Sequence, residues 1–162
     1  MRLTSAPVFN WFGRILLALF GGLSSSLAFP RENLTPIIFV SVIALFLSVY
    51  QLKVMPAFLI GLIGGLSFYL SQIEWMSLYL GPVPWVALST LEAIIFALGM
   101  SAIAFSWSHL SSAKLPKHLG PTIISLSLAT IWTAREWISI SLPYGGFPWS
   151  RLAQTQSDTF LA

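Results

Sequence analysis

The stretch Trp85–Trp107, WVALSTLEAIIFALGMSAIAFSW, decides the class of this protein because it contains a single charged side chain, Glu92. A helix that crosses the roughly 30 Å hydrocarbon core of a bilayer needs about 20 predominantly apolar residues, and this stretch supplies them. The sequence therefore predicts a membrane-spanning helix here.

The whole chain has the same apolar character. Of its 162 residues, 56% are hydrophobic and only 8% are charged, whereas soluble domains contain about 25% charged residues. A chain of this length has room for about five crossings and for no separate soluble domain. We therefore predict an all-α, polytopic membrane helix bundle that forms a single domain over residues 1–162.

Four further apolar runs accompany the first one. The predicted membrane helices and the loop that follows them cover residues 11–29, 34–50, 54–71, 85–107, 121–140 and 141–162. The connection 72–84 contains Trp75, Tyr79 and two prolines but no Lys or Arg, so we expect it to be partly helical and to lie at the membrane surface. Near the end of the first run, Ser26-Leu27-Ala28 also fits a signal-peptide cleavage site that follows a basic N-terminal region. The interpretation that we favour is an uncleaved first helix.

Two glycines in the third run, Gly61 and Gly65, are spaced four residues apart. That spacing places them on one helix face, where a neighbouring helix can approach closely. The general abundance of glycine in membrane helices explains them equally well.

Basic residues predict the orientation of the bundle. Lys and Arg are enriched in cytoplasmic loops, and an inside N-terminus puts five of them on the inner side: Arg2, Arg14, Lys53, Lys114 and Lys117. The outer side then receives Arg31 and Arg151. The loop after the fifth helix is therefore expected on the outer face, where Pro143 ends the helix and Phe147 and Trp149 anchor in the interface.

Glu92, about eight residues into the fourth run, lies roughly 12 Å from its outer end at 1.5 Å per residue. Charges at such depth are costly, so they are neutral, paired or face a wet cavity. Arg135 in the fifth run lies at a comparable depth. We predict that Glu92 pairs with Arg135, either to fix helix register or to shape a polar vestibule that opens to the outer face.

Several kinds of chemistry have no support in the sequence. The absence of cysteine removes disulfides, thiolate metal sites and a cysteine nucleophile, and the two isolated histidines give no basis for a metal site. The few scattered charges do not form a nucleic-acid surface. No phosphate-binding loop, nucleophile elbow or zinc motif is present, so we expect no cofactor and no catalytic residues within this chain.

The last part of the sequence carries the motifs of a known family. Glu136-Trp137 is followed by Gly146-Phe147-Pro148-Trp149 and by a Gln-rich turn, and Leu27-Ala28-Phe29-Pro30 ends the first run. In this order the motifs resemble the apolipoprotein N-acyltransferase family. The arginine that usually follows Glu-Trp-Leu is missing, and Arg135 instead precedes the glutamate.

The resemblance implies a multi-pass enzyme of the bacterial inner membrane that transfers an acyl chain from a phospholipid to the N-terminal diacylglyceryl-cysteine of a lipoprotein. It implies a Glu-Lys-Cys triad on a nitrilase-like domain, which this sequence lacks. We therefore expect a truncated platform that is inactive alone, in which Gly146, Phe147, Pro148 and Trp149 line the lipid route or only anchor the loop. The alternative is a self-contained membrane protein, such as a transporter subunit or an assembly partner.

Overall fold

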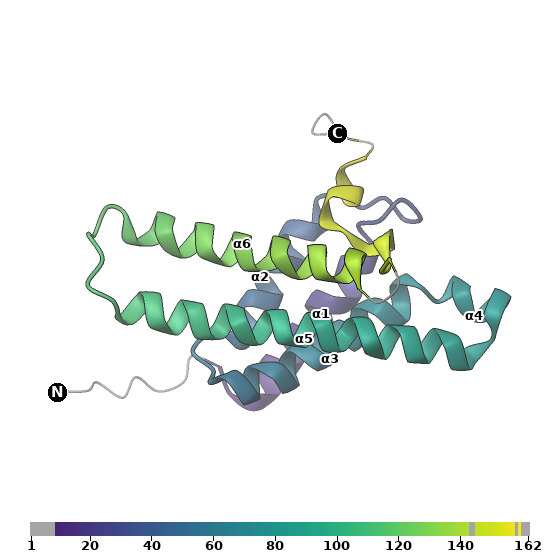
Figure 1. Ribbon diagram of the computed structural model, residues 1–162, viewed down its shortest axis with the longest axis horizontal. Coiled ribbons are helices and arrows are strands. Elements are labelled where there is room, and N and C mark those ends of the chain that lie inside the picture. The colour runs from purple at the N-terminus through teal and green to yellow at the C-terminus, as the bar shows by residue number, and fades with distance from the viewer. Residues whose placement is uncertain (1–8, 143–144, 158, 160–162) are drawn as a thin grey trace.

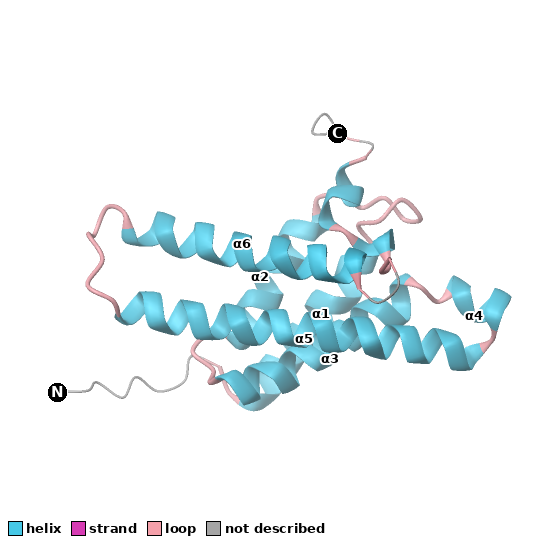
Figure 2. Ribbon diagram, in the orientation of Figure 1, coloured by secondary structure: helices cyan, strands magenta, loops and turns pink. Residues whose placement is uncertain are grey.

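The computed structural model describes residues 9–142, 145–157 and 159, so Arg2 and Pro143 lie outside the described residues. Within this part of the chain the backbone forms helices and loops and no strand (Figure 2). In chain order the elements are α1 (Trp11–Ser26), α2 (Ile37–Val49), α3 (Val54–Gln72), α4 (Trp75–Leu80), α5 (Pro82–Ser112), α6 (Gly120–Ser141) and the 3-10 turns η1 (Pro148–Ser150) and η2 (Leu152–Gln156). The prediction of an all-α helix bundle is confirmed.

Helix α3 is the centre of the bundle. It packs against α5 on one side and α1 on the other, while α2 covers α1 and α6 lies along α5 (Figure 1). The core between these helices includes Ile60 and Tyr69 of α3 together with Phe96 and Met100 of α5, all at most 1% exposed. Helix α6 therefore contacts the rest of the bundle mainly through α5.

Glycines let α3 approach both of its main neighbours. A Cβ atom on Gly65 would lie 3.0 Å from the Cα of Ala93, and one on Gly61 would lie 2.8 Å from the Cβ of Met100. On the other side, a Cβ on Gly22 of α1 would overlap the backbone of α3. The prediction that Gly61 and Gly65 form a close-packing face is confirmed, because the backbone of α5 occupies the space that larger side chains would need.

The first two helices are shorter than the sequence predicts. The predicted ranges are 11–29 and 34–50, whereas α1 ends at Ser26 and α2 begins at Ile37. Between them the chain makes a compact turn in which Asn33 has φ +55°. The N–H groups of residues 27–29 bond to carbonyls three residues back instead of four, so α1 gives way to tight turns. The left-handed conformation of Asn33 then keeps these turns from running into α2 as one right-handed helix.

The fourth predicted span differs from the structure more than the first two do. The sequence predicts a connection over 72–84 and a span over 85–107, but the connection contains the separate helix α4 and the start of α5. Gly81, with φ +83°, ends α4 and allows the reversal. Pro82 and Pro84 then lie in the first turn of α5, where no backbone N–H donor is required. The prolines therefore open the helix rather than precede it. Helices α3 and α6 coincide with their predicted ranges to within about a residue.

Two helices in the described part of the chain, α3 and α5, are long and apolar enough to cross a membrane. Helix α2 is apolar but has only 13 residues, about 20 Å at 1.5 Å per residue. The chain is a membrane protein with two such helices, and the count of five spans stays a prediction.

A buried arginine joins the first two helices. The side chain of Arg14 in α1 is 2% exposed, and its Nη1 donates to the carbonyls of Ser48 at 2.9 Å and Tyr50 at 2.8 Å. The last carbonyls of a helix lack intrahelical partners and carry the negative end of its dipole. Arg14 therefore caps the C-terminus of α2 and fixes its position against α1.

Replacing Arg14 by methionine is expected to lower the free energy of unfolding by about 2–4 kcal/mol, because two buried carbonyls lose their donor. Thermal or denaturant unfolding in detergent micelles measures this change. The matched control is Arg31→Met, since Arg31 is 73% exposed and pairs only at the surface with Glu32 and Glu74. Equal losses in the two variants would contradict a capping role for Arg14.

Candidate functional site

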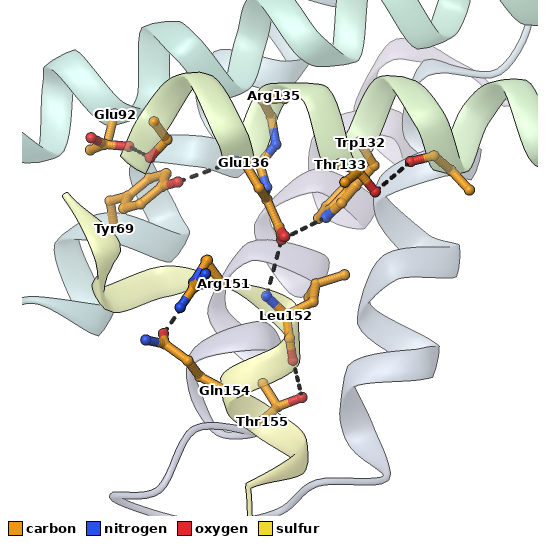
Figure 3. Close-up of polar contacts among 12 residues, drawn as sticks. Tyr69, Glu92, Trp132, Thr133, Arg135, Glu136, Arg151, Leu152, Gln154 and Thr155 are labelled. Atoms are coloured by element: carbon orange, nitrogen blue, oxygen red, sulfur yellow. Dashed lines mark hydrogen bonds and ion pairs between the residues drawn. The ribbon is translucent and has the colours of Figure 1, made fainter. Parts of the chain in front are cut away.

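Glu136 connects α6 to the loop that follows it. Its Oε1 atom accepts a hydrogen bond from the backbone N–H of Leu152 at 3.0 Å and from Nε1 of Trp132 at 2.9 Å, and Nη2 of Arg135 lies 3.5 Å away (Figure 3). One carboxylate oxygen thus holds the first residue of η2 against the helix. Trp137, the other half of the Glu-Trp motif, is 65% exposed.

The beginning of the loop folds back onto the same helix. The N–H of Phe147 donates to the carbonyl of Ser139 at 2.8 Å, which brings Gly146 against the last turn of α6. Gly146 has φ +67°, and a Cβ atom there would overlap the backbone of Ser139 and Ile140. Only glycine fits this contact without strain, so the glycine of the Gly-Phe-Pro-Trp motif allows the loop to dock.

The two aromatic residues of the motif have different surroundings. Phe147 is 8% exposed and packs in a small cluster with Ile73 and Met76, so the structure places it inside the protein rather than at the membrane interface. Trp149 is 59% exposed and its ring meets Trp75 edge-on at 6.4 Å between centroids. Phe147 therefore fixes the loop to the bundle, and interfacial anchoring by Trp149 stays a prediction. Pro148, the third residue of the motif, opens η1.

Arg135 lies in a pocket of aromatic rings between α6 and α5. Its guanidinium carbon is 4.9 Å from the centroid of Phe96 and 4.6 Å from that of Trp132, and Nη1 donates to the Tyr69 hydroxyl at 3.2 Å. Such cation–π contacts stabilise a desolvated cation. Gly99 makes this position possible, since a Cβ there would lie 2.7 Å from Cδ of Arg135.

Glu92 reaches the same region from α5 but has another partner. Its Oε2 accepts a hydrogen bond from Ser139 Oγ at 2.5 Å, and the carboxylate is 1% exposed. The predicted direct pair of Glu92 with Arg135 is not formed: the carboxylate that pairs with Arg135 is Glu136, its neighbour in sequence. Arg135 and Ser139 lie one turn apart on α6, so the shorter Ser139 side chain faces Glu92 while the long arginine extends to Tyr69 (Figure 3).

The sequence therefore identified the charges of this cluster but not all of their partners. Tyr69, Ser139 and Gly99 were not expected to contribute. A signal existed for one of them, because Trp132, Arg135 and Ser139 recur at spacings of three and four and form one face of a helix. The backbone N–H of Leu152 carries no side-chain signature, so the contact with Glu136 follows only from the fold.

The contacts of this cluster fix the positions of its side chains and of the loop. Buried, mutually bonded residues of α3, α5 and α6 hold a glycine-containing loop at one end of the bundle. Among the described residues no group of three or more His, Cys, Asp and Glu side chains converges to hold a metal ion.

A comparison with known families gives these features their context. Residues 21–162 match the N-terminal domain of apolipoprotein N-acyltransferases. The match covers all the described helices except the first part of α1, and it includes Glu92, Arg135, Glu136 and the docked loop. This chain therefore belongs to the apolipoprotein N-acyltransferase family and represents the membrane region of that family.

Proposed function

We propose that this chain is the membrane platform for an acyl transfer from a phospholipid to the N-terminal diacylglyceryl-cysteine of lipoproteins in the bacterial inner membrane. In this proposal residues 1–162 form a single domain with five spans. The catalytic Glu-Lys-Cys groups that the resemblance implies belong to a nitrilase-like domain and not to this chain. By itself the chain is therefore inactive.

The observation that carries the proposal is the attachment of the loop to α6. Glu136 fastens η2 through the N–H of Leu152, and the backbone of Phe147 bonds to Ser139 one turn further along. Two attachment points at the end of a membrane helix give the loop a fixed position. A fixed loop can support a second domain close to lipid substrates, which must remain in the bilayer.

Charge supports the proposed orientation. Lys53, between α2 and α3, and Lys114 and Lys117, between α5 and α6, are all exposed. These two connections lie at the same end of an up-and-down bundle, opposite to the docked loop. The positive-inside rule then puts the N-terminus in the cytoplasm and the docked loop at the periplasmic face.

A domain exchange tests the proposal. In a strain depleted of its apolipoprotein N-acyltransferase, a chimera that carries this chain in place of the enzyme's own N-terminal domain is expected to restore N-acylation, measured by mass spectrometry of a lipoprotein N-terminus. The chain alone is expected to restore none. Inactivity of a stably inserted chimera, or activity of the chain alone, would contradict the proposal.

A further inference from the structure

The buried polar atoms that lack a hydrogen-bond partner gather in one part of the bundle. Among the described residues they are Nε1 of Trp85, Oγ of Ser89, Oε1 of Glu92, Nε of Arg135 and Oγ of Ser150. Three of them belong to α5, one to α6 and one to η1. Elsewhere in the described chain buried serines are bonded, for example Ser101 to the carbonyls of Val54 and Ala97.

The three atoms of α5 form a line along one helix face. Trp85, Ser89 and Glu92 are separated by four and three residues, which places them on successive turns of the same face. The line extends about 10 Å at 1.5 Å per residue. Its first member, Trp85, packs against the cluster that contains Phe147 of the docked loop. The line therefore begins beneath the loop and ends at Glu92 inside the bundle.

These atoms are too deeply buried to reach solvent at the protein surface. Ser89 is 0% and Glu92 is 1% exposed, and Ser150 is 7% exposed. Lipid tails offer no hydrogen bonds, so an unpaired polar atom in a membrane protein is costly and is normally bonded to protein or water. The chemistry of the set is mixed: an indole N–H and a guanidinium N–H only donate, a carboxylate oxygen accepts, and two hydroxyls do both.

We propose that Trp85, Ser89, Glu92 and Ser150 bind a file of water molecules that connects the end of the bundle beneath the docked loop to the Glu92 carboxylate. Water is the occupant that both donates and accepts at each position, and buried waters typically make about three hydrogen bonds to such groups. The file makes Glu92 the inner end of a hydrated vestibule. This inference rests on the unpartnered atoms and not on the acyltransferase function.

Single-cysteine variants of the purified chain in liposomes test the file, because the natural sequence contains no cysteine. The label is deuterium, because only a water-sized probe can follow such a file: after transfer to D2O, a thiol exchanges its hydrogen where water reaches it, and the infrared S–H stretching band reports this labelling. Ser89→Cys is expected to exchange at least ~10-fold faster than Ser101→Cys. Ser101 is the matched control, because it is a buried serine of the same helix whose hydroxyl is bonded. Leu98→Cys, at a 58% exposed position, checks that a lipid-facing thiol stays unlabelled.

Ser150→Cys repeats the measurement from the loop side and leaves α5 unaltered. If circular dichroism shows that Ser89→Cys does not fold, the result at position 150 decides the test. Fast labelling at position 89, or at position 150 in that case, supports the file. Labelling no faster than that of Ser101→Cys would overturn the proposal, because the region would then be dry. Neither outcome depends on acyl transfer, so failure here leaves the proposed function untouched.

Discussion

Replacing Arg135 by methionine is expected to lower the free energy of unfolding by about 3–5 kcal/mol, the typical cost of removing one partner from a buried ion pair. Arg135 is 4% exposed and neutralises Glu136, whose side chain is 16% exposed. Its loss also removes the donor to Tyr69 and leaves Phe96 and Trp132 around a smaller, uncharged side chain. Chemical or thermal unfolding in detergent micelles gives the difference.

Glu92→Gln is the matched control for Arg135→Met. Glutamine has nearly the volume of glutamate and keeps an oxygen that accepts the hydrogen bond from Ser139. Since Glu92 forms no ion pair with Arg135, we expect this change to cost less than about 1 kcal/mol. If Glu92→Gln lost as much stability as Arg135→Met, our conclusion that Glu92 and Arg135 form no direct ion pair would be wrong. The direct pair that the sequence suggested would then be the better description.

Gly146→Ala is expected to release the loop from α6. The new Cβ would overlap the carbonyl of Ser139 and the backbone of Ile140, and the residue would also have to keep φ +67°. The bond from Phe147 to Ser139 cannot form once the backbone moves away. Limited proteolysis of the chain in micelles should show cleavage in the loop at least ~10-fold faster, since exposed and undocked loops are preferred cleavage sites.

The neighbouring glycine provides the control for this loop. Gly145 has φ +96°, but a Cβ there meets no atom within 4 Å. Gly145→Ala therefore introduces backbone strain of roughly 1 kcal/mol without a collision, and we expect only a small change in cleavage rate. Similar rates in the two variants would show that strain, rather than docking against α6, governs the loop.

The sequence predicted the class of fold because class depends on composition and run length. Each long apolar run contains a helix, and the Gly61 and Gly65 spacing predicted a close approach to a neighbouring helix, which the structure identifies as α5. Helix ends were less accurate, because they depend on local turns. The prolines that begin α5 are compatible both with a loop and with a first helical turn, and only the reversal at Gly81 decides between them.

The site was predictable in its charges and not in its pairing. Depth along two helices placed Glu92 and Arg135 at a similar level, but rotation about each helix axis decides which side chains meet. Rotation turns Ser139 toward Glu92 and leaves Arg135 between Tyr69 and Glu136. A sequence shows which residues share one face of a helix. How that face is turned toward a second helix depends on packing at positions such as Gly99.

The length of α5 is expected to make the helix bundle sensitive to bilayer thickness. Its 31 residues extend about 46 Å at 1.5 Å per residue, well beyond a hydrocarbon core of about 30 Å. Such a helix is accommodated by tilting or by extending past the core, and the balance changes with the membrane. Because α6 packs along α5 and Glu136 fastens the loop to α6, a change in the tilt of α5 is expected to move the loop with it.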